Sequence, residues 1–210
     1  MVIDVFRAFT TAAAAFAAGA GKIIPVKEIR EAIALLDRFP DALTMGEESG
    51  APVPGFDYSN SPIQFQGVDL DGRTIIQRTS NGTQGLVDSL NAANLLASSL
   101  VCASATVRLL QRIDPRSLTL METGRHGGGH GYEDEACGDM IEKRLRGEFV
   151  DLEDIRSKAR RSATAKPFSD PKEIHHPQED LEFALQIDKY DFAMMVFMEN
   201  DLPVLRKMDI

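Results

Sequence analysis

The sequence predicts an α/β fold: a layered, mixed β-sheet flanked by helices, with a C-terminal β-hairpin. Short apolar runs alternate with segments of helical periodicity along most of the chain, which is the pattern of βα units. Near the end, apolar runs at 191–198 and 202–208 are separated only by Glu199-Asn200-Asp201, which indicates the hairpin. The length of 210 residues fits one domain over residues 1–210 and is enough chain to bury a core.

The first half of the chain is expected to alternate strands and helices. Met1 to Val5 reads as a buried strand, and Ala8 to Ala18 reads as a helix that Thr10 or Thr11 could help to start. The elements expected next are a strand at 22–26, a helix at 28–39, a strand at 42–45 and, after a long loop rich in glycine and proline, a strand at 73–79 introduced by the Asp71-Gly72 turn. A loop of that length is usually functional or disordered.

The second half continues the same alternation. The expected elements are a helix near 84–91, a strand near 95–100, a helix at 103–112, a strand at 117–121 and, after a glycine-rich loop, a helix at 133–145. The segment 151–177 is charged, so we expect it to be partly helical and exposed to solvent.

Composition and charge exclude several classes of function. A net charge of -9 argues against nucleic acid as a partner, because binding its backbone requires a basic face. No apolar run approaches the roughly 20 residues of a membrane span, and the chain begins Met1-Val2-Ile3-Asp4 without a basic leader, so a cytoplasmic location without membrane contact is expected. Cys102 and Cys137 lack zinc spacing and are expected to be reduced and unpaired.

Polar residues gather in four segments, each beginning where an apolar run stops: 4–11, 46–62, 78–83 and 123–138. In an open α/β sheet the ligand crevice lies outside the carboxyl ends of the strands, so polar segments after strands are where a site would be built. The sequence therefore predicts an enzyme site assembled from distant pieces.

The first segment places Asp4 near the end of a strand and Arg7 three residues later. A carboxylate at a strand end can ligate a metal or act as a nucleophile, and arginine is a bidentate donor to phosphate or sulfonate. The structural alternative is that Asp4 caps the next helix and Arg7 is a solvated surface charge.

Residues 78–83 read Arg-Thr-Ser-Asn-Gly-Thr. Glycine allows close backbone approach, and a following helix favours an anion at its start, which is the logic of a phosphate cradle. The structural alternative is a plain Asn-Gly turn with capping residues, and the local sequence leaves both open.

The remaining two segments are also ambiguous when viewed alone. Glu133-Asp134-Glu135 could be favourable partners of a helix dipole or could hold Mg²⁺, which prefers oxygen ligands. His126 and His130 have the spacing of helical zinc ligands, but three glycines between them make such a helix improbable, so a ligand-contacting loop is favoured over zinc. Gly46-Glu47-Glu48 and the following loop have a density of turn formers that explains an ordered loop without any ligand.

Taken in order, these segments resemble the 2-phosphosulfolactate phosphatase family, the magnesium-dependent enzymes of coenzyme M biosynthesis. The resemblance spans nearly the whole chain and rests on I-D-V-F-R-A-F-T-T, G-E-E-S-G with P-G-F-D-Y-S-N-S-P, T-S-N-G-T, A-S-A, E-D-E-A-C-G and the closing D-F-A-M-M-V-F and L-P-V-L-R. Members usually carry a further strand-containing segment before Asp4. Glu48 stands where a basic residue is frequent, Cys102 where Asn is common, and 126–130 is unusually rich in glycine and histidine.

The resemblance implies Mg²⁺-dependent hydrolysis of the phosphate ester (R)-2-phospho-3-sulfolactate to 3-sulfolactate and phosphate. The candidates for metal ligation are Asp4, Glu47, Glu133 and Asp134, and those for catalysis are Asp4, Arg7 and Glu133. The candidates for binding substrate and phosphate are Arg7, Thr79, Asn81, Gly82, Thr83 and Arg125, of which Arg125 would meet sulfonate or carboxylate. The metal would neutralise phosphoryl oxygens and either activate water or assist an attacking carboxylate.

The expected partner is a small anionic phosphorylated substrate, and a homodimer is compatible with the sequence. Phe6 stands where haloacid-dehalogenase-type phosphatases place a second aspartate, so the nucleophile stays open between Asp4 and a metal-bound water. The alternative from another class is a noncatalytic binder or sensor of a small phosphorylated metabolite that uses the same cradle without turnover.

Overall fold

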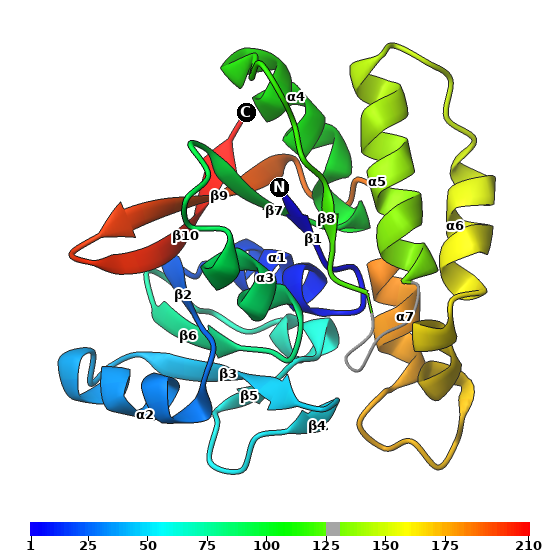
Figure 1. Cartoon of the computed structure of the whole chain (residues 1–210). Helices are drawn as coiled ribbons and strands as arrows, with labels where there is room; N and C mark the ends of the chain where they lie inside the picture. The colour runs from blue at the N-terminus through cyan, green and yellow to red at the C-terminus, as the bar shows by residue number, and fades with distance from the viewer. Residues whose placement is uncertain (125–130) are drawn as a thin grey trace.

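The computed structural model describes residues 1–124 and 131–210, and one mixed β-sheet forms its centre (Figure 1). Within these ranges the strands are β1 (Val2–Ile3), β2 (Lys22–Val26), β3 (Leu43–Glu48), β4 (Ala51–Pro52), β5 (Tyr58–Ser59), β6 (Thr74–Arg78), β7 (Leu95–Ser98), β8 (Met121–Glu122), β9 (Phe192–Glu199) and β10 (Leu202–Asp209). The α-helices are α1 (Ala8–Ala17), α2 (Ile29–Arg38), α3 (Gly82–Asp88), α4 (Ala103–Ile113), α5 (Tyr132–Leu145), α6 (Leu152–Arg160) and α7 (Gln178–Ala184). Short 3-10 helices are η1 (Pro62–Phe65), η2 (Leu100–Cys102) and η3 (Ala163–Ser169).

The sheet consists of two parallel groups joined by an antiparallel hairpin. Its strand order is β4-β3-β6-β2-β10-β9-β7-β1-β8, and β5 pairs with β3 off this path. Strands β3, β6 and β2 are mutually parallel, as are β7, β1 and β8, whereas β9 and β10 pair antiparallel with each other and with their outer neighbours. The predicted mixed sheet and C-terminal hairpin are confirmed, and the hairpin connects the two halves of the sheet.

Helices cover both faces of the sheet because alternate strand residues point to opposite sides. Ile23 and Ile75 pack in the same core cluster as α1, whereas the next residues, Ile24 and Ile76, pack in the cluster that contains Ala32 of α2. On the β1 side, a further cluster joins that strand to α4, α5 and α6, which lie beside one another in Figure 1. The layered arrangement expected from the sequence is therefore present.

Helix α1 is buried along almost its whole length, and its alanines allow close packing against the sheet and η1. The expectation that Thr10 or Thr11 starts this helix is wrong, because both residues lie inside it. The Thr10 hydroxyl donates to the carbonyl of Val5 at 2.8 Å. Asp4 satisfies the first turn instead, since the Ala8 N–H donates to its Oδ1 at 3.0 Å.

Three other expectations differ from the structure. The strand placed at 117–121 is found only at β8, because β1 offers two residues for pairing and meets Met121 and Glu122. The short elements η1, η2, β4 and β5 and the helix α7 were not expected, whereas α6 and η3 lie in 151–177, which was expected to be partly helical. The segment 151–177 is only partly exposed: Ile155, Ala159 and Phe168 are buried against α5 and β1, so η3 belongs to the core. None of the helices within 1–124 and 131–210 has the length and apolar character needed to cross a membrane.

Gly46 lets β3 approach β6 closely, and we expect its replacement to be far more costly than that of another glycine with positive φ. A Cβ at Gly46 would lie 1.8 Å from the carbonyl oxygen of Arg78, whereas one at Gly55 would meet nothing within 4 Å. Gly55→Ala should cost about 1–2 kcal/mol of unfolding free energy from its backbone conformation alone. Gly46→Ala should cost roughly 3 kcal/mol or more, because the strands must separate. Urea denaturation measures both, and equal losses would contradict this account.

Candidate active site

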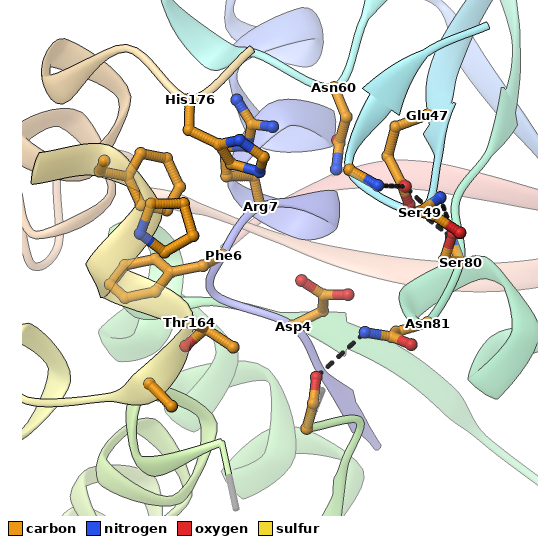
Figure 2. A pocket seen from close by; sticks show the side chains of 15 residues that line it. Asp4, Phe6, Arg7, Glu47, Ser49, Asn60, Ser80, Asn81, Thr164 and His176 are labelled. Carbon is orange, nitrogen blue, oxygen red and sulfur yellow. Dashed lines mark hydrogen bonds between the residues drawn. The ribbon is translucent and has the colours of Figure 1, made fainter. Parts of the chain in front are cut away.

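A cavity of about 310 Å³ lies where the ends of β1, β3 and β6 meet η3 (Figure 2). Its wall comes from seven separate parts of the chain, and the lining residues are Asp4, Phe6, Arg7, Glu47, Ser49, Gly50, Asn60, Ser80, Asn81, Gly124, Ala163, Thr164, Pro167, Phe168 and His176. Four of the residues selected from the sequence are therefore brought together here: Asp4, Arg7, Glu47 and Asn81.

Asp4 is the most perturbed acid on this wall. Its side chain is 6% exposed, and Figure 2 shows the carboxylate pointing into the cavity. Burial, followed by repulsion from the carboxylates of Glu133 and Glu47, raises the pKa of Asp4 to about 7, although hydrogen bonds from Ala8 N–H and Thr123 oppose the shift. Asp4 thus caps α1, which is the structural alternative given by the sequence. Its carboxylate also faces the cavity without a positive countercharge.

Asp134 lies beside the strand that carries Asp4, although the two are far apart in sequence. Its Oδ1 accepts from Val5 N–H at 2.8 Å, and its Oδ2 accepts from Gly124 N–H at 3.1 Å and from the Thr123 hydroxyl at 3.3 Å. Burial and repulsion from Asp4 and Glu133 raise its pKa well above the usual value. Asp134 therefore fastens the start of α5 to the ends of β1 and β8.

The carboxylates of Glu133 and Glu47 also accept hydrogen bonds from other parts of the protein. The buried Glu133 accepts a hydrogen bond from the hydroxyl of Ser162, which links α5 to η3. Glu47 accepts from Ser80 N–H at 2.5 Å, from Gly50 N–H at 2.6 Å and from the Ser80 hydroxyl at 3.0 Å. Within 1–124 and 131–210, no group of three or more acidic, His or Cys side chains is arranged to hold a metal ion. The four proposed metal ligands are therefore near one another without forming a ready-made ligand set.

Arg7 is 4% exposed, so the view of this residue as a solvated surface charge is wrong. Its Nη1 donates to Asp180 Oδ2 at 2.5 Å and to the carbonyl of His175 at 3.1 Å. The guanidinium carbon lies 5.3 Å from the centroid of the Phe168 ring, at a distance typical of a cation–π contact. Arg7 is held on several sides while it lines the cavity.

The segment 78–83 is divided between the cavity and the core. The Asn81 amide lines the cavity and donates to the carbonyl of Gly124 at 3.0 Å. Thr79 and Thr83 are buried and bind each other: Thr79 N–H donates to Thr83 Oγ1 at 2.8 Å, and Thr83 N–H donates to Thr79 Oγ1 at 3.0 Å. A Cβ at Gly82 would lie 2.8 Å from Asp4 Oδ2, so this glycine allows α3 to approach Asp4. The capping interpretation explains Thr79 and Thr83, and neither residue lines the cavity.

Sequence reasoning missed several residues of the site. Asn60, Ser80 and His176 line the cavity, and Asp180 holds Arg7 from outside it. Asn60 stood in a loop that its turn-forming residues already explained, and His176 stood in a segment expected to be exposed. Burial lowers the pKa of His176, and the nearby Arg7 lowers it further. The proposed sulfonate or carboxylate ligand Arg125, together with His126 and His130, lies outside the described residues.

A cavity that gathers a buried carboxylate, an arginine and two amide side chains at strand ends is the arrangement of an α/β enzyme for a small polar substrate. Comparison with known proteins gives the family. A model of 2-phosphosulpholactate phosphatase matches residues 1–198, and the chain belongs to this family of phosphoric monoester hydrolases. The resemblance seen in the sequence motifs is thereby confirmed.

Several curated relatives carry the name "Probable 2-phosphosulfolactate phosphatase". One from Bacillus subtilis (strain 168) is 30% identical over 211 residues, covering 100% of this chain and 92% of the relative. One from Carboxydothermus hydrogenoformans is 45% identical over 124 residues, covering 59% of this chain and 51% of the relative. One from Thermoplasma volcanium is 28% identical over 191 residues, covering 91% of this chain and 85% of the relative.

The raised pKa of Asp4 predicts that Asp4→Asn stabilises the protein at neutral pH when no divalent cation is present. Between about pH 4 and pH 7 the folded state keeps a proton that the unfolded state has lost, so wild-type stability falls as pH rises through this window. Asn carries no such penalty, and the gain should grow with pH to on the order of 4 kcal/mol at pH 8. Urea titrations at pH 5 and pH 8 measure it.

Asp37→Asn is the matched control, because Asp37 is exposed on α2. Its stability difference from wild type should not change with pH. If the Asp4→Asn difference were also flat between pH 5 and pH 8, the assignment of a raised pKa to Asp4 would be wrong.

Proposed function

We propose that this protein is a Mg²⁺-dependent phosphatase that hydrolyses (R)-2-phospho-3-sulfolactate to 3-sulfolactate and phosphate. Family membership supports the reaction class, and the names of the relatives suggest the substrate. The observation that carries the proposal is the uncompensated Asp4 carboxylate on the wall of a cavity that also presents Arg7. A cavity that presents an unpaired carboxylate and an arginine can bind a polyanionic ester together with a cation.

The charges of the cavity wall support a cation. Asp4 and Glu47 are acidic, and Arg7, whose charge is already shared with Asp180, is the cation that the described wall offers them. A phosphate ester would therefore be repelled by the wall unless further positive charge accompanied it. The motif resemblance suggests Mg²⁺ for this role.

The residues present fit magnesium, which is usually held by one or two carboxylates while water and phosphate oxygens complete its shell. Asp4 is the best-placed ligand, because its carboxylate faces the cavity and has too little countercharge. Glu47, Glu133 and Asp134 would contribute negative charge and possible further oxygen ligands around it. Bound magnesium would supply neutralisation of phosphoryl oxygens and activation of the attacking group.

The chain's own groups would bind and orient the ester. The Arg7 guanidinium would pair with anionic oxygens, and the Asn60 and Asn81 amides would offer further hydrogen bonds to the ester. Hydrolysis breaks the bond between phosphorus and the ester oxygen, adds the oxygen of water to phosphorus and leaves a proton on the released hydroxyl group. Phe6 and Phe168 form an apolar part of the wall and would reduce the contact of a bound ester with bulk water.

We expect turnover of 2-phospho-3-sulfolactate to require Mg²⁺ and Asp4. Chelation with EDTA should abolish phosphate release, and added Mg²⁺ should restore it. Asp4→Asn should lower kcat at least 100-fold, within the range typical for loss of one acid, base or charge-stabilising group, while Asp37→Asn remains active. Binding of the ester without any turnover would instead identify the alternative, a noncatalytic sensor.

Magnesium should also stabilise the wild-type protein independently of turnover. Ligand binding to the folded state adds about 2.7 kcal/mol when the ligand is present at 100 times its Kd. A thermal melt should therefore move upward with Mg²⁺ for the wild type and for Asp37→Asn, and much less for Asp4→Asn. An equal upward shift in Asp4→Asn would place the ion away from Asp4.

The site is expected to prefer an ester with two further negative charges over a neutral alkyl phosphate. Buried positive charge is favoured when a ligand completes its ion pairs, so kcat/KM should fall from phosphosulfolactate to phospholactate to an alkyl phosphate, by tenfold or more overall. Arg7→Lys keeps the charge but loses the planar fork and should raise KM for phosphosulfolactate. Equal kcat/KM values for the three esters would leave a generic phosphatase.

A further inference from the structure

Asp180, in the first turn of α7, is the least exposed acid among the described residues near the cavity, at 0%. One of its oxygens, Oδ2, accepts from Arg7 Nη1 at 2.5 Å across 173 residues of sequence. Asp180 does not line the cavity itself, so it can affect the binding of a ligand only by positioning the residues to which it is hydrogen-bonded.

The second oxygen of Asp180 holds another part of the wall. Its Oδ1 accepts from the Ser61 hydroxyl at 2.8 Å and from Ile63 N–H at 3.3 Å. Ser61 directly follows Asn60, a cavity residue that is 5% exposed. One buried carboxylate therefore fixes both the chain at Arg7 and the chain at Asn60.

Asn60 has an unsatisfied hydrogen-bonding group at this place. Its buried Oδ1 has no hydrogen-bond partner among residues 1–124 and 131–210, and Figure 2 shows the side chain extending toward the cavity between Arg7 and Glu47. A buried amide without a partner costs free energy unless a ligand or water completes its hydrogen bonds. Because Oδ1 can only accept, it calls for a donor such as a water or a hydroxyl group of the ligand. The Nδ2 group of the same amide makes no hydrogen bond to the described residues and is the donor that could meet an oxyanion in the cavity.

Arg7 has donors to spare on the same side. Both side-chain hydrogen bonds that it makes to the described residues use Nη1, and a guanidinium carries five N–H donors in a fixed plane. Because Asp180 and the His175 carbonyl hold one nitrogen, the plane cannot swing freely, and its other donors keep one direction. Such pre-orientation lowers the cost of binding an oxyanion.

We propose that Asp180 is a positioning residue that fixes Arg7 and Asn60 as a joint binding pair for an oxyanion group of the ligand, either phosphoryl or sulfonate. The inference deepens the proposed function and rests on it for the identity of the ligand. The competing account is that Asp180 only neutralises a buried arginine. The two accounts predict opposite signs, because removing a mere competitor for Arg7 would tighten anion binding, whereas removing a positioning group weakens it.

The test measures Kd by isothermal titration calorimetry for inorganic phosphate and, separately, for 3-sulfolactate, with Mg²⁺ present. Asp180→Asn keeps the shape of the side chain and removes its charge, and we expect Kd to rise at least tenfold for the probe whose oxyanion Arg7 and Asn60 bind. Glu179→Gln is the matched control, because the neighbouring residue in the same helical turn is exposed and loses the same charge. Its Kd should stay within twofold of wild type. An unchanged or lower Kd in Asp180→Asn for both probes would overturn the proposal.

A double variant separates positioning from folding. Arg7→Gln with Asp180→Asn removes both charges of the buried pair, so it should recover most of the stability lost by either single variant. Kd should nevertheless stay at least tenfold above wild type, because the oriented guanidinium is gone. Recovery of wild-type Kd together with stability would show that the pair is structural only.

Ser61→Ala tests the link between Asp180 and the Asn60 side of the cavity. It also provides a test of the proposal if Asp180→Asn does not fold. It removes one hydrogen bond to Asp180 and leaves the ion pair with Arg7. Kd should rise severalfold, and the effect should largely disappear in an Asn60→Ala background, because the two residues act through the same group. Fully independent effects would contradict the link between Ser61 and Asn60.

These outcomes are separable from failure of the proposed function, because calorimetry needs no turnover. A wild-type protein that binds the probes without hydrolysing the ester, and loses affinity in Asp180→Asn, would be a sensor in which Asp180 has the role proposed. If the protein hydrolyses the ester but Kd and KM are unchanged in Asp180→Asn, the protein is the proposed phosphatase and Asp180 is not a positioning residue.

Discussion

Buried negative charge is the constraint on which the rest of this structure depends. Asp134, Glu47 and Asp180 are withdrawn from solvent, and each is satisfied by donors from parts of the chain that are distant in sequence. Unpaired buried charge is costly, so these contacts must form together with the fold. Asp134 fastens α5 to β1 and β8, Glu47 fastens the end of β3 to the end of β6, and Asp180 fastens α7 to α1 and to the chain before η1. The carboxylates thus hold the walls of the cavity in place.

Asp4 differs from these three carboxylates because it is buried, has a pKa raised to about 7 and also lines the cavity, whereas Asp134, whose pKa is raised as well, does not line it. The neighbours of Asp4 include further carboxylates that raise its pKa, and the groups that oppose this shift are hydrogen-bond donors rather than a cation. A carboxylate in that condition lowers stability at neutral pH, and such a cost is common where a residue serves binding or chemistry. Gly82 packs closely against Asp4, because a Cβ at this position would lie 2.8 Å from Asp4 Oδ2.

Local signals in the sequence were sufficient for most of the fold. The strand at 22–26 was predicted with its observed bounds, and α4, α5 and the hairpin were placed to within a residue or two, because their periodicity is carried by contiguous residues. Motif order gave the family, and four of the residues selected from the sequence, Asp4, Arg7, Glu47 and Asn81, line one cavity. The roles of these residues as ligands remain predictions.

What the sequence could not give depends on contacts between distant segments. Asp180 looks like an ordinary acidic residue in a first helical turn, and only the folded chain brings it to Arg7. Thr79 and Thr83 have the residue types of a phosphate cradle, yet their hydroxyls are used by each other's backbone groups. In the same way, η3 lines the cavity because hydrophobic residues of 151–177, such as Ile155 and Phe168, belong to the core cluster that contains α5. The high average polarity of this segment hides these few buried residues from sequence reasoning.

The separation of Asp4 from Arg7 shows how these levels combine. The two residues are three positions apart in sequence, both are buried, and opposite charges so placed would ordinarily pair with each other. If they did, each charge would neutralise the other, and the cavity would offer neither an unpaired carboxylate nor a free guanidinium to a ligand. Asp180 instead takes Arg7, so Asp4 is left short of positive charge while Arg7 is held with donors to spare. The sequence places a cation and an anion at the end of one strand, and a third residue from the far end of the chain keeps them apart. Under the proposed function, that division would leave Asp4 free to hold Mg²⁺ and Arg7 free to bind an anion, as hydrolysis of a phosphate ester requires.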